Sequence, residues 1–413
     1  MSTEPLGAHA AVPRTGTLWL ATGVAYADRL AAFVLPMLVL RTGAGQAAYA
    51  AVEFVISVSV LLATFFDAGL RNYVLFHARD AGKPSLTTQR TLQAFVPIAA
   101  AHWSLLLLAA LPLAVGHAVG GEPAGLLVLG VLRGAALATL GLATQLLILH
   151  GRPMAGTLVS LASWAVGALS FALPADVDVV VRTAVFFSAA AILLVSASVL
   201  LWRHTRLRPG PAGWSHLRAA LAWGWPLLAA AAASMAVAHV SRMYAYARLP
   251  LADMVGFTFW LRVFSIIQLS HAALSAVLSP QIFAQRAGGL DLANTGRYLR
   301  FMAPPVLVAL GLASGMALLD DGMLPAVPRL PLGAALAIGA YVVCWCAGAY
   351  LEIYLTRDSH TSMVLIASLL AAGLFLLLLL AVPPSTPLAL ALSMGAAATC
   401  YLMLLAWRLK EPS

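Results

Sequence analysis

Four arginines occur inside strongly apolar stretches of this sequence: Arg29, Arg133, Arg242 and Arg262. A charged side chain inside a bilayer costs roughly 2.5–3.5 kcal/mol on insertion scales, so it usually faces a partner or a water-filled cavity. The planar guanidinium group donates two parallel hydrogen bonds and stays charged when desolvated, which suits phosphate better than a lysine does. The chemistry indicated is binding of a strong anion, such as a diphosphate, within a membrane.

A stripe of polar residues assigns Arg262 to one face of its segment. The members of the stripe, at spacings of 4, 3, 3, 3, 4 and 4, are Thr258, Arg262, Ser265, Gln268, His271, Ser275 and Ser279. Residues three and four apart share a helix face, and a polar face in a membrane must meet protein or water. We therefore expect Arg262, Gln268 and His271 to line a cavity and to contact the substrate.

Three carboxylates are candidates for balancing these cations or for coupling transport to an ion: Asp28, Glu53 and Glu352. Asp28 precedes Arg29, but sequence neighbours lie about 100° apart on a helix, so each can pair with another helix instead. Glu53 and Glu352 fall near the ends of their apolar segments. For both of them, a position at the membrane interface is the alternative to a functional role.

Arg242 and Arg133 also have two interpretations. Arg242 follows His239 by three residues, so the two share a face, but Arg242 lies near a segment end and could extend to the interface. Arg133 lies among Gly130, Gly134 and Gly141, and its depth in the membrane is ambiguous. Both arginines remain candidate substrate-binding residues together with Arg29 and Arg262.

The segments that carry these residues are predicted membrane helices. The chain has 413 residues, of which 62% are hydrophobic and only 9% are charged, whereas a soluble domain carries about 25% charged residues. A span needs about 20 apolar residues. The expected spans are residues 17–40, 47–66, 92–116, 124–149, 154–173, 181–202, 219–244, 252–279, 299–319, 331–355, 362–382 and 386–407. The predicted fold is an all-α polytopic membrane protein with about twelve transmembrane helices.

The basic residues predict how these spans are oriented and divided. With a cytoplasmic N-terminus, sixteen of the 24 lysines and arginines fall in cytoplasmic segments and four in outer ones. Cytoplasmic loops are enriched in these residues, so both termini are expected to be cytoplasmic. This orientation also accounts for the net charge of +9 without a nucleic-acid partner. We predict two six-helix halves around a central cavity, residues 1–202 and 219–413, joined by a cytoplasmic linker at 203–218.

Signatures of catalysis or of cofactor binding are missing from the sequence. It contains no Gly-x-x-x-x-Gly-Lys-Ser/Thr phosphate loop, no metal-ligand cluster and no nucleophile elbow. The three cysteines, Cys344, Cys346 and Cys400, lie in apolar segments without metal-ligand or disulfide spacing. We expect a protein that is not an enzyme, that binds no metal and that has no cofactor.

Two stretches resemble polysaccharide-unit flippases of the multidrug/oligosaccharidyl-lipid/polysaccharide exporter superfamily. Residues 47–79 read AAYAAVEFVISVSVLLATFFDAGLRNYVLFHAR, and residues 240–285 read VSRMYAYARLPLADMVGFTFWLRVFSIIQLSHAALSAVLSPQIFAQ. The first is similar to the helix 2 region of these flippases, with its acidic-Ala-Gly-Leu turn. The second is similar to their helix 7–8 region, although Ser241 stands where many relatives carry an acid.

The resemblance implies a flippase that moves an undecaprenyl-diphosphate-linked oligosaccharide across the bacterial inner membrane by alternating access. The product would serve surface polysaccharides such as the O-antigen of lipopolysaccharide. Arg29, Arg242 and Arg262 would be cavity cations, with Asp28 and Glu53 as their balancing acids. The implied partners are the lipid-linked oligosaccharide and membrane lipids, together with a glycan polymerase and chain-length proteins.

Two other classes stay open. A cation-coupled multidrug antiporter of the same superfamily would have a similar hydropathy profile, but its cavity should be acidic to bind cationic drugs. A membrane-embedded glycan-processing enzyme usually needs a large outer loop or a conspicuous His/Asp pair, and the sequence has neither.

Overall fold

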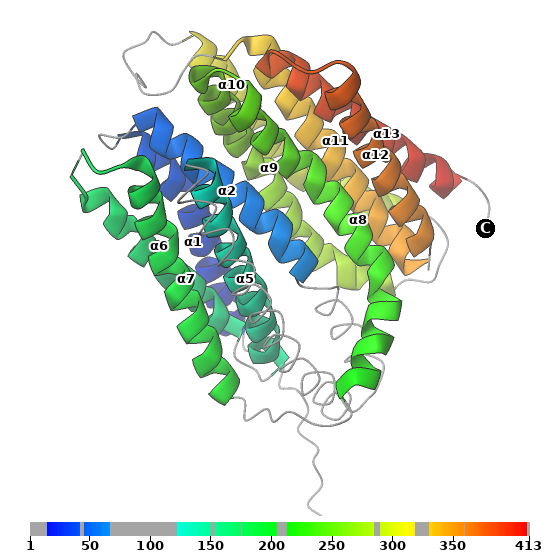
Figure 1. The fold of residues 1–413 in the computed structure, drawn as a ribbon. Helices are drawn as coiled ribbons and strands as arrows, with labels where there is room; N and C mark the ends of the chain where they lie inside the picture. The colour runs from blue at the N-terminus through cyan, green and yellow to red at the C-terminus, as the bar shows by residue number, and fades with distance from the viewer. Residues whose placement is uncertain are drawn as a thin grey trace, which may run out of the picture.

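A computed structural model of the chain describes residues 15–41, 45–66, 122–149, 153–174, 176–204, 213–284, 290–318, 330–358 and 360–410. Within these ranges every regular element is helical (Figure 1). The N-terminal group contains α1 (Thr15–Leu38), η1 (Val39–Arg41), α2 (Gly45–Phe66), α5 (Glu122–Leu149), α6 (Pro153–Ala168), η2 (Leu169–Ala172) and α7 (Val179–His204). The C-terminal group contains α8 (Gly213–Arg248), α9 (Leu251–Ala284), α10 (Leu292–Leu318), α11 (Leu332–Arg357), α12 (Thr361–Ala381) and α13 (Pro387–Lys410).

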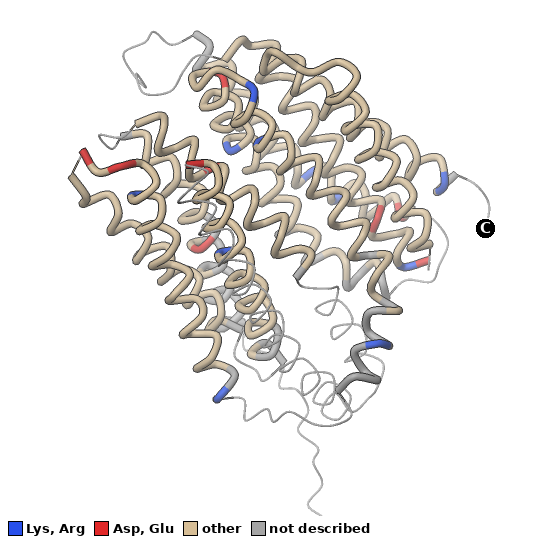
Figure 2. Tube along the Cα trace, viewed as in Figure 1, with Lys and Arg blue, Asp and Glu red and all other residues tan. Residues whose placement is uncertain are grey.

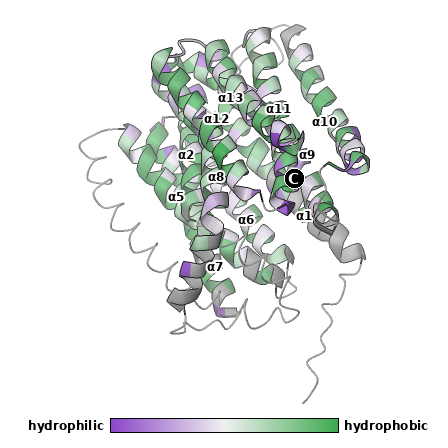
Figure 3. Ribbon diagram, turned by 90° about the vertical axis from the view of Figure 1, so that its right-hand side faces the viewer, coloured by the Kyte–Doolittle hydropathy of each residue, from purple (hydrophilic) through white to green (hydrophobic). Residues whose placement is uncertain are grey.

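The helices confirm an all-α polytopic membrane protein. In the described part of the chain, 10 helices are long and apolar enough to cross a membrane, and α1 adds a further helix of 24 residues. Hydrophobic residues make up most of the length of the helices (Figure 3). A helix satisfies its own backbone hydrogen bonds, which is the condition for crossing lipid. The expected span at residues 92–116 lies outside the described residues.

The helices pack mainly within their own groups. In the N-terminal group α5 contacts α2, α6 and α7, and in the C-terminal group α11 contacts α9, α10 and α13. The two groups meet where α2 packs against α8 and α9, and where α1 touches α9 (Figure 1). Between the groups, α7 ends at His204 and α8 begins at Gly213, so residues 203–204 and 213–218 of the expected 203–218 linker are helical.

Most charged residues lie near the ends of the helices, and a few lie inside the bundle (Figure 2). A charge inside the bundle must be paired or must meet water, because burying an isolated ion is very costly. The interior charges therefore locate the part of the molecule where function is to be sought.

Small residues allow α2 and α5 to approach closely. A methyl group added at Gly134 would lie 2.9 Å from the backbone oxygen of Ser59, whereas one added at Gly141 of the same helix would meet nothing within 4 Å. Close approach at small residues is the usual way in which membrane helices gain packing energy. It also brings Arg133 next to Ser59, whose hydroxyl accepts a hydrogen bond from Arg133.

Gly134→Ala is expected to destabilise the protein by about 1–3 kcal/mol, because the added methyl group must push the α2 backbone away. Gly141→Ala provides the matched control and should be neutral or slightly stabilising, since alanine is the better helix former. Thermal unfolding of the two purified variants in detergent measures the difference. Equal unfolding temperatures would show that α2 and α5 do not pack in this way.

Candidate functional site

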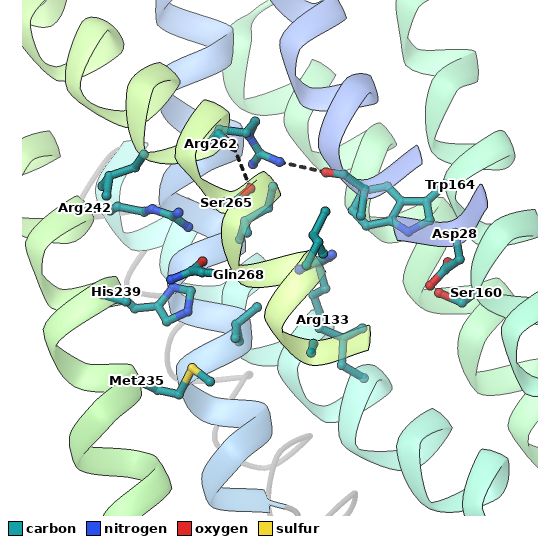
Figure 4. A pocket seen from close by; sticks show the side chains of 18 of the residues that line it. Asp28, Arg133, Ser160, Trp164, Met235, His239, Arg242, Arg262, Ser265 and Gln268 are labelled. Carbon is teal, nitrogen blue, oxygen red and sulfur yellow. Dashed lines mark hydrogen bonds between the residues drawn. The ribbon is translucent and has the colours of Figure 1, made fainter. Parts of the chain in front are cut away.

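A cavity of about 500 Å³ lies between the two groups of helices. Its wall comes from α1, α2, α5, α6 and α7 on one side, and from α8, α9 and α11 on the other. Its volume falls within the ~300–1,000 Å³ range of typical small-molecule sites. Arg133, Arg242 and Arg262 all line this cavity (Figure 4).

The polar stripe of α9 faces the cavity over its central part. Arg262, Ser265, Gln268 and His271 all line the cavity. Thr258, the first residue of the stripe, is fully buried and donates its hydroxyl proton to the Met254 carbonyl of its own helix, 2.8 Å away. The 3.6-residue repeat therefore presents one cation and three neutral polar groups to the same space.

Arg262 joins the two groups of helices. Its Nε donates to Oε1 of Glu53 at 2.7 Å, and its Nη2 forms an ion pair with the same oxygen. Its Nη1 donates to the Ala32 carbonyl at 2.7 Å. Arg262 is 8% exposed and Glu53 is completely buried. The guanidinium of α9 thus holds both α2 and α1.

Arg133 is buried inside the protein. It is 5% exposed and lines the cavity. Its guanidinium carbon lies 5.2 Å from the ring centroid of Trp164 and 5.0 Å from that of Phe187. Aromatic faces at this distance attract a cation by about 0.5–2 kcal/mol. These rings and the Ser59 hydroxyl fix the position of the charge.

Arg242 has fewer protein partners than the other described arginines of the cavity. It lines the cavity together with His239. Neither side chain makes a hydrogen bond or ion pair with another described residue, and Arg242 Nε and His239 Nδ1 are both buried without a hydrogen-bond partner. Buried polar atoms are normally satisfied. Arg242 therefore has donors free to receive an anion that enters the cavity.

Two of the remaining predicted residues, Asp28 and His271, line the cavity. Asp28 lines the cavity near Ser160 (Figure 4). His271 also lines it, with Nδ1 2.8 Å from the Tyr298 hydroxyl. Arg29 lies on α1, but the position of its side chain falls outside the described part of the structure.

Glu352 does not line the cavity. It accepts a hydrogen bond of 2.8 Å from the Tyr401 hydroxyl and so faces α13. Tyr341 and Trp345, earlier in the same helix, do line the cavity. The physical reason is that α11 packs closely against α13, so the face that meets the cavity at Trp345 meets a neighbouring helix two turns later.

Residues of α6 and α7 that reach the cavity were not expected from the sequence. Ser160, Ser163 and Trp164 line it from α6, and Phe187 lines it from α7. A signal for the first three exists, since residues at positions 160, 163 and 164 share one helix face. The aromatic contact with Arg133 carries no such signal, because it depends on how two helices pack.

The described charges in and around the cavity have a positive sum. Arg133, Arg242 and Arg262 face Asp28 and the buried Glu53. In a site shielded from water, an uncompensated charge attracts a counter-ion much more strongly than it would at the surface. The arrangement favours an anionic ligand. Among the described residues, no group of His, Cys, Asp or Glu side chains could hold a metal ion.

A helical bundle with a cavity between two groups of helices is typical of secondary transporters. No family model matches the sequence, and no curated protein matches it. Solved structures do show the same fold. Lipid II flippase MurJ in an inward closed conformation superposes with a TM-score of 0.63 at 12% identity, covering 95% of this chain and 87% of that one.

Two further neighbours belong to the MOP superfamily. An inward-facing multidrug resistance MATE family transporter has a TM-score of 0.57 at 13% identity, with 93% and 94% of the two chains covered. A transporter from Pyrococcus furiosus, described as having a binding pocket of reverse polarity, has a TM-score of 0.52 at 12% identity, with 95% and 94% covered. The chain has the fold of these proteins, which are a flippase and transporters and not enzymes.

Proposed function

We propose that this protein is a flippase that translocates an undecaprenyl-diphosphate-linked oligosaccharide across the bacterial inner membrane. The product would supply surface polysaccharide synthesis. The observation that carries the proposal is the cavity between the two groups of helices, with its positive charge and with Arg242 unpaired among the described residues. A diphosphate matches that charge, and arginine is the side chain best suited to it.

The cavity offers different groups to the different parts of such a substrate. Arg242 and Arg262, with Arg133 on the opposite side of the cavity, would hold the diphosphate. Trp164 and Trp345 present apolar ring faces, and Gln268 presents amide hydrogen-bonding groups, for the sugars. The polyprenyl chain would stay in the bilayer between the halves. Arg29 remains a candidate for a further diphosphate contact from α1.

The contacts between the groups suggest the side from which substrate enters. They include the Arg262–Glu53 pair and a 3.0 Å hydrogen bond from Tyr246 to Glu122, near the end where α8 joins α9. With both termini cytoplasmic, this is the outer end, so the cavity would load from the cytoplasm. A membrane potential that is negative inside then favours outward movement of an anion, by about 2.3 kcal/mol per charge per 100 mV. A cation gradient is the alternative driving force.

A multidrug antiporter is the competing function, because MATE transporters share this fold. The sign of the cavity argues against it. A cationic drug would enter a site with three described arginines and two described carboxylates, and like charges repel at close range in a site of low dielectric constant.

The proposal predicts that purified protein in liposomes moves labelled undecaprenyl-diphosphate-oligosaccharide between leaflets, and that an inside-negative potential accelerates outward movement. Accessibility of the label to an added glycosidase measures the transfer. Undecaprenyl monophosphate and a cationic dye are the control substrates. Transport of the dye with no movement of the lipid-linked glycan would identify an antiporter and refute the flippase assignment.

A further inference from the structure

In this structure the Arg262 guanidinium is already occupied by protein. Glu53 takes its Nε and Nη2 hydrogens, and the Ala32 carbonyl takes a hydrogen from Nη1. A substrate anion therefore cannot gain the full fork of donors on Arg262 while Glu53 stays in place. Arg242, by contrast, keeps its Nε without any partner in the described structure.

An anion could accept the hydrogen bonds that the Glu53 carboxylate accepts from Arg262. Only its Oε1 accepts hydrogen bonds from Arg262, while its Oε2 is buried with no hydrogen-bond partner. A carboxylate with one unsatisfied buried oxygen is in a costly environment. A phosphate group has more acceptor oxygens and more charge, so it can satisfy the same guanidinium more completely.

The Arg262–Glu53 pair also connects the two groups of helices. Arg262 belongs to α9, whereas Glu53 and Ala32 belong to α2 and α1. Removing one partner from a buried ion pair is strongly destabilising, because the other charge is left unpaired. An anion that takes the place of Glu53 avoids this cost for Arg262, since the arginine exchanges one partner for another.

We propose that Glu53 is a resident substitute for the substrate's phosphate, and that an entering diphosphate displaces it from Arg262. The anion would first meet Arg242 and would then replace the Glu53 carboxylate on Arg262. The exchange releases α9 from α2 and so unlocks the two halves. The idea rests on the proposed function in one respect, namely that the cavity takes a diphosphate.

The exchange couples binding to opening in a way that thermodynamics permits. A ligand shifts a conformational equilibrium only by the difference between its affinities for the two states. Diphosphate contacts Arg262 fully only when Glu53 has left, so it favours the unlocked state. A change that weakens the Glu53 contact lowers the free energy needed to remove Glu53 from Arg262, so it should strengthen anion binding by up to the same factor.

Binding of inorganic pyrophosphate to the purified protein tests the exchange. In Glu53→Gln the amide keeps the shape and one acceptor oxygen but loses the competing charge, so pyrophosphate should bind about tenfold more tightly, which is 1.4 kcal/mol. Asp253→Asn is the matched control, because Asp253 lies in the first turn of α9 and does not line the cavity. Unchanged or weaker binding to Glu53→Gln would overturn the proposal.

Cross-linking tests the unlocking. The rings of Phe54 on α2 and Tyr246 on α8 lie 4.7 Å apart between centroids. Cysteines at these two positions, in a chain whose three native cysteines are replaced, should be joined rapidly by a short bifunctional thiol reagent. Saturating pyrophosphate should slow the reaction several-fold, and Glu53→Gln should slow it without any ligand. A rate that neither change affects would show that Glu53 does not hold the halves together.

These assays separate the inference from the proposed function. They use pyrophosphate alone, so they do not depend on the lipid or the glycan. If the exchange occurs but no lipid-linked oligosaccharide is moved in liposomes, the flippase proposal fails and the exchange stands. If the lipid-linked oligosaccharide is moved while pyrophosphate neither binds Glu53→Gln more tightly nor slows cross-linking, only the exchange is refuted.

Discussion

Replacing Arg262 with alanine is expected to abolish transport of the lipid-linked substrate and to lower the free energy of unfolding by about 3–5 kcal/mol. The destabilisation has a specific cause. Glu53 is completely buried and the only described hydrogen bonds to its carboxylate come from Arg262, so the substitution leaves that carboxylate without a partner. Thermal unfolding in detergent and the liposome assay measure the two effects separately.

A double variant distinguishes the structural role of Arg262 from its role in transport. Arg262→Ala combined with Glu53→Ala removes both charges, so much of the lost stability should return. Transport should stay absent, because the cavity has lost a cation and the two groups of helices have lost the ion pair between them. A double variant no more stable than Arg262→Ala alone would contradict the ion-pair explanation. Full transport by Arg262→Ala would contradict the site assignment itself.

Arg242→Gln, unlike Arg262→Ala, is expected to weaken anion binding without lowering stability. It should weaken pyrophosphate binding by about 100-fold, or two tenfold steps of 1.4 kcal/mol, since hydrogen bonds to a charged group are worth about 1.5–3 kcal/mol each. It should not destabilise the protein, because Arg242 makes no hydrogen bond or ion pair with another described residue and its Nε is buried without a partner. Removing that charge orphans no other described group.

Arg248→Gln is the control for this experiment. Arg248 lies six residues further along α8, is exposed and does not line the cavity. The same substitution there should change neither pyrophosphate affinity nor unfolding temperature. If Arg242→Gln destabilised the protein as strongly as Arg262→Ala, Arg242 would have to be a structural residue, and its availability to an anion would be refuted.

Hydrophobic periodicity was sufficient to predict the helices and one wall of the site. The expected span at residues 252–279 corresponds to α9 (Leu251–Ala284), and that at 331–355 corresponds to α11 (Leu332–Arg357). The polar stripe on α9 predicted that Arg262, Gln268 and His271 share a face, and all three line the cavity. Periodicity reports which side of a helix is polar because the geometry of a single helix is nearly constant.

Periodicity was insufficient wherever a contact joins two helices. Glu53 and Arg262 are separated by 209 residues, and Ser59 and Arg133 by 74. A shared helix face also fails to predict the surroundings of Glu352. It lies on the same face of α11 as Trp345, yet it contacts Tyr401 on α13 and does not line the cavity. These outcomes depend on how each helix is rotated and which neighbour it meets, and small residues such as Gly134 influence that packing through side-chain shape.

By itself, therefore, the sequence determined that this chain is an all-helical membrane protein with arginines inside its apolar segments. Those features follow from composition and from the repeat of one helix. Only the tertiary structure decided which arginine is paired with a protein carboxylate and which keeps a donor without a partner in the described structure. Arg262 is occupied by Glu53 and Arg242 keeps an unpaired donor, because the balance of charge in a cavity depends on distances between helices that no local pattern specifies.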